Sequence, residues 1–230
     1  AFDQDLGWCV DDEVSLSYAF DGTLCASTSC GVTQADGACA PSPAPTMTPA
    51  PTATPAPTVP LDDTSIRTAV AAWLSDRAAA EATYGHISRW GTRGVTDMSY
   101  LFCGASGWSS CNTAAASFNE DIGDWDTSGV TRMDYMFYYA SAFSRNIGGW
   151  AVDSVTTMYY MFRSASSFNQ DIGAWDTSGV TSLSYMFYYA SAFDQDLDWC
   201  VDDDVSLSSA FYGTTCESTS CGVTQVDGGC

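Results

Sequence analysis

Three consecutive stretches of the chain carry one 25-residue sequence: FNEDIGDWDTSGVTRMDYMFYYASA (118–142), FSRNIGGWAVDSVTTMYYMFRSASS (143–167) and FNQDIGAWDTSGVTSLSYMFYYASA (168–192). The first and third copies agree at 20 of 25 positions, and the second agrees with the third at 11. A fixed period between about 20 and 50 residues is the signature of a solenoid, in which each repeat buries its apolar face against its neighbours. The sequence therefore predicts a stack of short coils.

Each copy divides into three segments with different patterns. Phe168, Gln170 and Ile172 alternate, which favours a short strand. Residues 175–179 read WDTSG, whose Asp, Ser and Gly are typical of a turn. Apolar residues then recur at helical spacing over 180–187, which predicts that a short helix or 3₁₀ segment returns on the opposite side. We expect an α/β repeat solenoid with one parallel strand per coil, stacked about 4.8 Å apart.

The charge balance excludes several classes of partner. Asp and Glu number 28 against seven basic residues, all of them Arg, and the net charge is -21. Nucleic acids and anionic membranes need a basic face, so neither is expected as a partner. No apolar run approaches the ~20 residues of a membrane span. No signal peptide is recognisable, and we interpret the start at Ala1 as removal of a signal or as a piece of a longer protein.

The ten cysteines predict disulfides and an oxidising compartment, so we expect an extracellular or cell-surface protein. Zinc is disfavoured because there is no CxxC pair and only one histidine. Among the three pairings open to the last four cysteines, we favour Cys200–Cys216 and Cys221–Cys230. The candidate disulfide residues are Cys9, Cys25, Cys30, Cys39, Cys103, Cys111, Cys200, Cys216, Cys221 and Cys230.

A second period of 191 residues is laid over the first. Residues 1–39 match residues 192–230 at 31 of 39 positions. Residues 1–40 are therefore interpreted as the last coil and cystine cap of a preceding module. The apolar side chains of this segment have no earlier coil to pack on, and burying each is worth roughly 1.5–3 kcal/mol. We expect Phe2, Leu6, Trp8 and Phe20 to dock on an upstream module or a neighbouring subunit.

Residues 41–60 hold all eight prolines, mixed with Ala and Thr. Proline fixes φ and removes a donor, so this stretch is predicted to be an extended polyproline-II linker spanning on the order of 60 Å. Its composition is also that of O-glycosylated stalks, and a bare spacer is the alternative. The candidate O-glycosylation sites are Ser42, Thr46, Thr48, Thr52, Thr54 and Thr58.

The remaining boundaries follow from local signals. Residues 61–85 are predicted to form a helical cap, with Thr64 or Ser65 as N-cap, a second cap at Ser75–Asp76 and an end at Gly85. Residues 86–192 are assigned to four coils, and residues 103–111 form a loop pinned by its own disulfide. Residues 193–230 are the last coil and a cystine cap.

The motif FNQDIGAWDTSGVTSLSYMF at 168–187 resembles the BspA-type leucine-rich-repeat proteins and the related 25-residue repeats of mycoplasma lipoproteins. The helical lead-in at 68–102 and the Cys-rich tail look like versions found in eukaryotic microalgae. The resemblance covers about 64–230 plus 1–39. It implies a leucine-rich-repeat-like solenoid at a cell surface or outside the cell, in an adhesive or structural role, with no catalytic residues.

The search for chemistry leaves few candidates. The Trp column, from Trp90 to Trp199, is interpreted as a core or edge ladder, with a sugar-stacking strip as the alternative. Acidic clusters suggest bound calcium as a weaker alternative, but none of them has EF-hand spacing. Side chains at one position of successive coils are instead expected to form hydrogen bonds with the backbone of the neighbouring coil: Asp121, Asn146, Asp171 and Asp196. His86 supports no catalytic triad, so we expect no enzyme and no cofactor. Partly exposed tyrosines are favoured as assembly or glycan contacts: Tyr138, Tyr139, Tyr188 and Tyr189.

Two hypotheses follow from the sequence. The first is a structural subunit of an extracellular, O-glycosylated filament built from head-to-tail 191-residue modules, whose partners are other copies of itself and the glycans attached to the linker. The second is a surface adhesin that binds glycan or protein without forming filaments.

Overall fold

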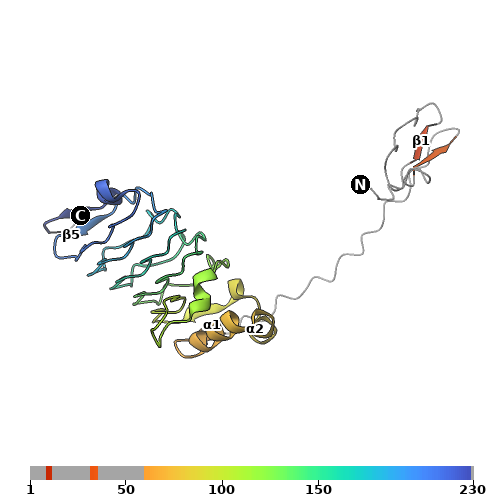
Figure 1. Ribbon diagram of the computed structural model, residues 1–230, viewed down its shortest axis with the longest axis horizontal. Coiled ribbons are helices and arrows are strands. Elements are labelled where there is room, and N and C mark those ends of the chain that lie inside the picture. Colours follow the sequence, from red (N-terminus) through yellow and green to blue (C-terminus); the bar gives the residue numbers. More distant parts are fainter. Residues whose placement is uncertain (1–8, 12–31, 36–59, 229–230) are drawn as a thin grey trace. The chain divides into compact units, whose positions relative to one another are not determined.

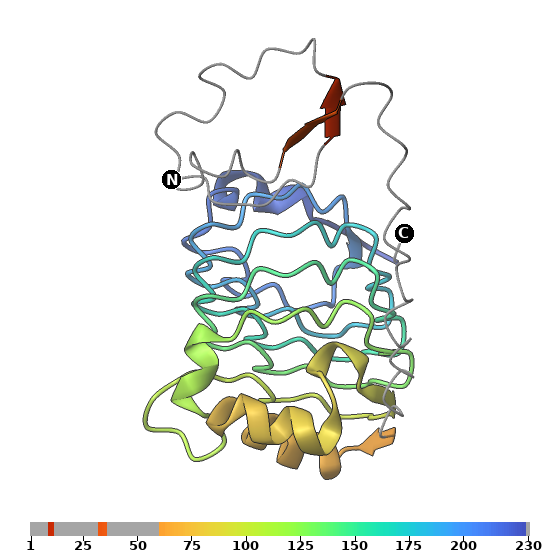
Figure 2. The same ribbon diagram turned by 90° about the vertical axis from the view of Figure 1, so that its right-hand side faces the viewer.

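The computed structural model describes residues 9–11, 32–35 and 60–228. The chain divides into two compact units, Ala1–Thr54 and Pro55–Cys230, and each is described by itself. In the second unit, the chain winds through stacked layers, with helices at one end and β5 at the other (Figures 1 and 2).

Two helices cover the first layer of the stack, as the sequence pattern of 64–84 predicts. Helix α1 spans Ser65–Ser75 and α2 spans Arg77–Tyr84. The Asp76 side chain caps α2 by accepting from the Ala79 amide, and Gly85, with φ 75°, ends it. At the start of α1 the predicted Thr64 cap makes no side-chain bond; the Asp62 carboxylate accepts from the Thr64 and Ser65 amides instead. The buried face of α1 consists of Ile66, Ala69, Val70 and Trp73.

Short parallel strands join this end to the first coil. Strand β3 (Pro60–Asp62) pairs in parallel with β4 (Gly91–Gly94), and the 3₁₀ turn η2 (Ile87–Arg89) precedes β4. The Asp63 carboxylate accepts from the Thr96 amide at 2.7 Å, the Asp97 amide at 2.9 Å and the Thr96 hydroxyl at 2.8 Å. Burial of Asp63 opposes ionisation, but these three bonds hold the pKa of the carboxyl below its usual range. Asp63 thus fastens the helical end to the first coil.

The coils are held together by hydrogen bonds between residues about one repeat apart. Isolated parallel β-bridges join Asp97 to Arg132, Arg132 to Thr157, Thr157 to Ser182 and Ser182 to Ser206. Over 133–139, the amides of alternate residues donate to the next coil, for example Phe137 to the Met161 carbonyl at 2.9 Å. The intervening amides donate three residues back, as Met136 does to Met133. The segment is therefore a run of tight turns whose outer bonds link the layers.

This arrangement corrects two predictions about the coil. Residues 168–172 contain no strand, and residues 180–187 form turns with one bridge at Ser182 rather than a helix. An apolar residue at every third position points inward in consecutive turns as well as in a helix, so the pattern alone does not separate them. Tyr185 has φ 57°, a left-handed conformation that a helix excludes. The designation as an α/β leucine-rich-repeat-like solenoid stays a prediction.

The core is a set of aromatic columns running through the layers. Phe137, Phe162 and Phe187 stack with centroids 5.4 Å apart at each step, and all three side chains are fully buried. A second column, from Phe118 through Phe143 and Phe168 to Phe193, has steps of 6.0 Å. Identical side chains in register give each layer the same packing surface, which is the packing expected when one repeat stacks on another.

A disulfide-bonded loop interrupts the stack after the first coil. Cys103 and Cys111 are joined, as the sequence predicts, and the 3₁₀ turn η3 (Thr113–Ser117) leads back into the next coil. The amide of Gly104 donates to the Tyr138 carbonyl at 2.7 Å, so the loop begins in contact with the neighbouring layer.

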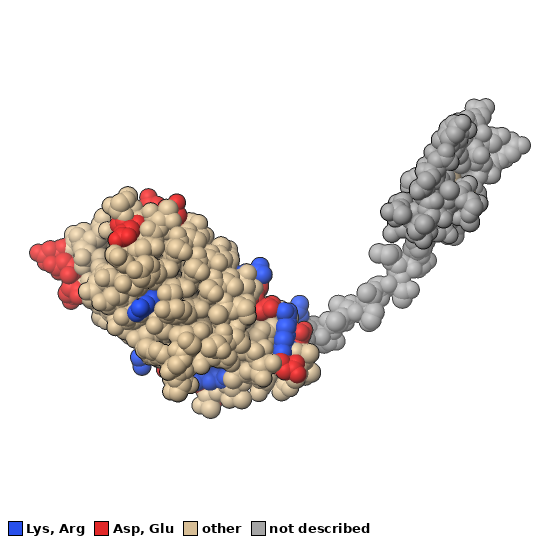
Figure 3. Space-filling view, in the orientation of Figure 1, with Lys and Arg blue, Asp and Glu red and all other residues tan. Residues whose placement is uncertain are grey.

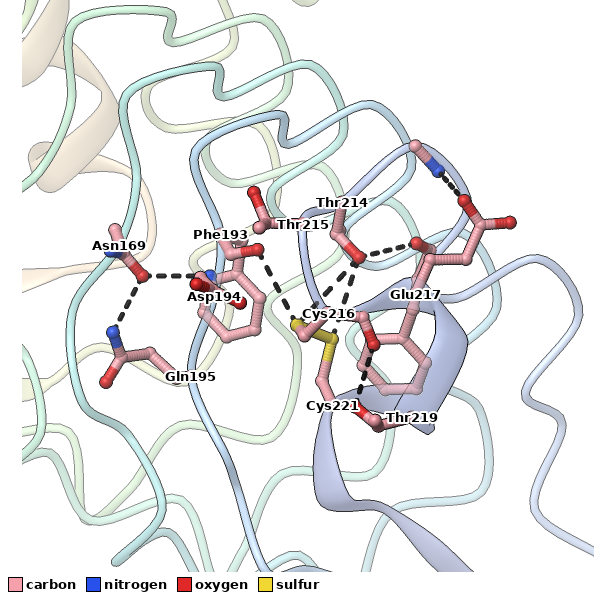
Figure 4. Close-up of a disulfide and its surroundings, with 12 residues drawn as sticks. Asn169, Phe193, Asp194, Gln195, Thr214, Thr215, Cys216, Glu217, Thr219 and Cys221 are labelled. Atoms are coloured by element: carbon pink, nitrogen blue, oxygen red, sulfur yellow. Dashed lines mark hydrogen bonds between the residues drawn. A yellow bond between two sulfur atoms is a disulfide. The ribbon is translucent and has the colours of Figure 1, made fainter.

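The C-terminal end carries a different disulfide from the one favoured above. Cys216 is bonded to Cys221, beside the turn η4 (Glu217–Gly222), so the pairing Cys200–Cys216 with Cys221–Cys230 is wrong (Figure 4). Cys200 is also disulfide-bonded. The left-handed conformations of Ser220 and Cys221 turn the chain back toward Cys216. The spacing of the cysteines in the sequence does not predict this local reversal of the chain.

Matching pairs of strands occur at the 191-residue offset. Strand β5 (Cys200–Asp202) pairs in parallel with β6 (Thr224–Val226), with Cys200 opposite Thr224. In the first unit, β1 (Cys9–Asp11) pairs in parallel with β2 (Thr33–Ala35), with Cys9 opposite Thr33. The two small sheets share their register, residue for residue.

Candidate functional site: a tyrosine surface

Four tyrosine rings form a ladder along the stack, one from each of four successive coils. The steps from Tyr100 to Tyr135, Tyr160 and Tyr185 measure 4.6, 5.1 and 4.8 Å between ring centroids, with interplanar angles of 8°, 5° and 9°. Each residue sits in the left-handed region, with φ between 57° and 65°. The rings are half-buried. We call these four residues the tyrosine ladder.

A second row beside the ladder carries a guanidinium between tyrosines. Arg163 lies 5.6 Å from the ring centroid of Tyr138 and 4.9 Å from that of Tyr188, which occupy the same position in the coils on either side. It also lies 4.9 Å from the Tyr160 ring of the ladder. Contacts of this length are cation–π interactions. Arg163 therefore joins the two rows into one layer of side chains.

The exposed rim of this region is aromatic too. Trp108, on the disulfide loop, is 47% exposed and contacts Tyr135 and Tyr138 at 5.8 and 5.7 Å. At the other end, Tyr189 and Tyr212 contact one another at 5.4 Å and remain exposed. The connected set is called the tyrosine surface and consists of Tyr100, Trp108, Tyr135, Tyr138, Tyr139, Tyr159, Tyr160, Arg163, Tyr185, Tyr188, Tyr189 and Tyr212.

An open hollow of about 370 Å³ borders the ladder. Tyr100, Tyr135 and Tyr159 line it on the aromatic side, together with Thr157 and Ser182. Its one ion pair joins two other lining residues.

That ion pair is fixed in place. The Arg132 guanidinium donates to one oxygen of Asp134 from Nη2 at 2.8 Å and from Nε at 3.1 Å. The other oxygen accepts from the Thr157 hydroxyl at 2.7 Å and from the Tyr159 amide at 3.1 Å. Since both oxygens of Asp134 are engaged, the hollow presents aromatic and hydroxyl groups rather than a free carboxylate.

Four tyrosines of this surface have hydroxyl pKa values above the usual one, which favours their neutral form. Burial is the main cause that raises the pKa of the Tyr100, Tyr135, Tyr138 and Tyr160 hydroxyls above its usual value, and neighbouring tyrosines add to it at Tyr135. The surface therefore offers O–H groups and ring edges, with little net charge, in a protein whose net charge is -21.

Charge is unevenly distributed over the molecule. On the face shown in Figure 3, acidic side chains gather at the end of the stack where β5 lies. Between them and the mixed charges near the helices, most of the face shown carries no charged side chain, apart from isolated basic ones.

Residues 73–111 and 107–222 match the family described as "Mycoplasma protein of unknown function, DUF285". The chain belongs to this family. Comparison with curated proteins and with solved structures gives no match. The matched residues include the whole tyrosine ladder, so the surface lies within the DUF285 region.

DUF285 membership and the disulfides fit an extracellular or cell-surface location. Within the described ranges, none of the helices has the length and apolar character that a membrane crossing requires.

The four tyrosines predicted as contacts fall at one edge of this surface. Tyr139 and Tyr189 are exposed, at 42% and 50%, and Tyr188 is half-buried. Tyr138 is only 6% exposed because Trp108 and Arg163 cover it, so its expected exposure is wrong. Sequence reasoning missed the ladder itself, although a Tyr directly before Met-Phe recurs at Tyr135, Tyr160 and Tyr185.

The tryptophan column of this DUF285 chain is core, as the favoured interpretation predicts, and the sugar-stacking alternative is wrong. Trp90, Trp125, Trp150, Trp175 and Trp199 are 3–4% exposed. The indole N–H groups of the three middle residues each donate to an Ile carbonyl of the preceding coil at 2.9–3.1 Å. The column thereby ties layers together from inside.

The acidic column behaves differently from the prediction. Asp121, Asn146 and Asp171 each accept from the amide two residues further on, at 3.0–3.1 Å, so their bonds lie within one coil rather than between coils. Bonds between coils come from a neighbouring column instead: Asn169, for example, accepts from the Asp194 amide (Figure 4).

Among the described residues, no group of acidic, His or Cys side chains is arranged to hold a metal ion.

Several predicted sites lie outside the described residues. These are the docking candidates Phe2, Leu6, Trp8 and Phe20, the O-glycosylation candidates in the linker, and the cysteines Cys25, Cys30, Cys39 and Cys230. His86 is engaged by Ser88 and Arg77 on its two ring nitrogens.

Proposed function

We propose that the chain is a repeating piece of an extracellular structural protein, in which BspA-like solenoid beads of 191-residue period are joined by a rigid, O-glycosylated Pro/Thr linker. The observation that carries the proposal is the recurrence of the β5–β6 sheet as β1–β2, in the same register and at the same offset as the sequence repeat. A chain that ends one bead, crosses a linker and begins the next has the order seen here. No catalytic role is proposed.

The extended linker makes bead spacing measurable. Residues 41–60 would span about 60 Å as polyproline II, whereas 20 Gly/Ser residues have a root-mean-square span of about 25 Å. A concatemer with residues 1–191 repeated four times before 192–230 would be imaged by negative-stain electron microscopy. Beads at regular spacing are expected, and a Gly/Ser replacement of 41–60 should shorten and blur that spacing. If both proteins gave the same irregular spacing, the rigid-fibre proposal would be abandoned.

Linker glycosylation is tested separately. The bare chain has a mass of 24.5 kDa, and secretion from a eukaryotic host is expected to add mass confined to peptides of residues 41–60. Recovery of only the bare mass would remove glycosylation from the proposal and leave the spacing result intact.

The tyrosine surface favours a second candidate, a surface adhesin that binds a partner without filament formation. Tyrosine is enriched at interfaces because its apolar ring carries a polar tip. This candidate requires saturable binding to a foreign surface by chains that do not associate with one another.

A further inference from the structure

The linker sequence contains a six-residue repeat that bears on its partner. Residues 43–60 read PAPTMT, PAPTAT and PAPTVP. Polyproline II has three residues per turn, so every third residue falls on one face. One face is then wholly apolar, with neither proline nor threonine: Ala44, Met47, Ala50, Ala53, Ala56 and Val59. All five threonines lie on the other two faces, so glycans on them would leave the apolar strip uncovered.

The strip and the ladder have commensurate spacing. Positions three residues apart in polyproline II are about 9.3 Å apart. The ladder steps are 4.6–5.1 Å, so one turn of the linker is about as long as two ladder steps, from one tyrosine to the next but one. Apolar side chains can therefore meet equivalent places on alternate coils over the length of the ladder.

The chemistry of the two surfaces also matches. Residues 43–60 carry no charge, and their backbone carbonyls have no internal partner in polyproline II. The ladder supplies tyrosine hydroxyls for these carbonyls, whereas in the adjoining hollow the Thr157 hydroxyl already donates to Asp134 and the Ser182 hydroxyl to Ser184. Aromatic-lined grooves are the usual recognition sites for proline-rich segments, because the preformed helix loses little entropy on binding. The charged groups there are the Arg132–Asp134 pair, which is already satisfied, and Arg163, whose guanidinium lies over the rings of Tyr138, Tyr160 and Tyr188.

We propose that the tyrosine ladder and the hollow beside it bind a stretch within residues 43–60 of a second copy of this chain, with the apolar strip of the linker lying along the ladder. The proposal rests on the fibre function and adds the lateral contact between neighbouring chains. A second copy is the occupant because the segment runs directly into β3 at Pro60, and a proline-rich helix is too stiff to reverse within its last few residues.

The test uses a labelled synthetic peptide of residues 41–60, titrated with the full chain and followed by fluorescence anisotropy. The peptide variant Ala50→Glu/Ala53→Glu places two charges on the strip. Its control, Thr48→Glu/Thr54→Glu, places the same two charges on another face. Saturable binding is expected for the native peptide, with at least ten-fold weakening by the strip variant and less than three-fold by the control.

The protein side has a matched pair as well. Tyr160→Asn removes a ladder ring while keeping a residue that tolerates the left-handed backbone, and Tyr189→Asn makes the same change outside the ladder at an equal φ of 58° against 60°. Binding should fall at least ten-fold in the first and stay within three-fold in the second, with circular dichroism confirming that both fold. Because Asn keeps the backbone conformation, a binding loss in Tyr160→Asn reports the ring rather than unfolding.

Three outcomes would overturn the proposal: no binding of the native peptide, equal weakening by the two charged peptides, or equal weakening by the two protein variants. Binding of a peptide-free oligosaccharide at Tyr160 in place of the peptide would also overturn it and assign the surface to glycans. Bead spacing in the concatemer does not depend on this contact, so failure here is distinguishable from failure of the fibre proposal.

Discussion

Gly148→Ala should destabilise the stack, while Gly149→Ala, one residue along, should not. A Cβ atom built on Gly148 would lie 2.6 Å from the carbonyl oxygen of Asp171 in the next coil, whereas nothing lies within 4 Å of a Cβ on Gly149. Neither glycine has a left-handed φ, so conformational strain does not separate the two substitutions. The difference between them is contact between layers alone.

The expected magnitude follows from that contact. A Cβ–O separation under 3.0 Å is not tolerated, so the Asp171 backbone must move away by about half an ångström or more, and overpacking of this kind costs about 1–3 kcal/mol. At Gly149 the substitution instead reduces the entropy of the unfolded chain, a gain of about 0.4–1 kcal/mol. With about 2–4 °C per kcal/mol for a domain of this size, the two variants should differ in Tm by roughly 3–16 °C.

Thermal and urea unfolding of the full chain, followed by circular dichroism, measure this difference. The structure also predicts a gradient: Gly123→Ala should resemble Gly148→Ala, because its Cβ would meet the Asn146 carbonyl at 2.7 Å. Gly173→Ala should cost less, at 3.1 Å from the Leu197 carbonyl. Equal Tm values for the Gly148 and Gly149 variants would refute the inference that the layers touch through this glycine column.

Three further predictions concern the core, the loop and pH. Trp175→Phe leaves the Ile147 carbonyl without its buried donor and should lose about 1–3 kcal/mol in urea unfolding, whereas Trp199→Phe should lose less, since within the described part of the chain that indole N–H has no partner. Replacing Cys103 and Cys111 together by Ser should lower the free energy of unfolding by about 2.5 kcal/mol through loop entropy; an unchanged value would mean that the loop is held by packing alone. Because burial raises the pKa of Tyr135 in the folded state, stability should hold up to pH about 10 and fall above it, as the unfolded chain ionises first; urea midpoints that stay flat to pH 11 would contradict this.

The sequence was sufficient to predict elements whose signals lie within a short segment of the chain. Helices α1 and α2 appear where apolar spacing and the Asp76 cap place them, and the loop between Cys103 and Cys111 is closed as predicted. The tryptophan column is buried because its register repeats with the apolar residues around it. Each of these inferences depends on residues close in sequence or on the 25-residue period.

Prediction from the sequence failed where one apolar pattern is compatible with two backbone conformations. Val130, Met133 and Met136 recur at every third residue, which a helix and a run of turns satisfy equally. The turns form because they let alternate backbone amides donate to carbonyls of the next coil, and these hydrogen bonds exist only when the coils are stacked. The pairing of Cys216 with Cys221 likewise follows from a left-handed reversal between them, for which the sequence has no Gly or Asn signal.

The ladder was missed for a related reason, and that reason strengthens its interpretation. Left-handed positions usually hold Gly or Asn, since other residues pay roughly 1–2 kcal/mol there. At Tyr135 and Tyr160, ring stacking at 5.1 Å returns about 0.5–1.5 kcal/mol per pair, which nearly offsets that cost. A tyrosine there therefore gives the fold little net stability over asparagine. Strained residues cluster at functional sites, where the surrounding structure holds them in place. Tyr160→Asn should accordingly leave Tm within about 3 °C of the native value. A large loss of Tm would mean that the ladder stabilises the fold. A small loss of Tm together with lost peptide binding would mean that the ladder serves recognition.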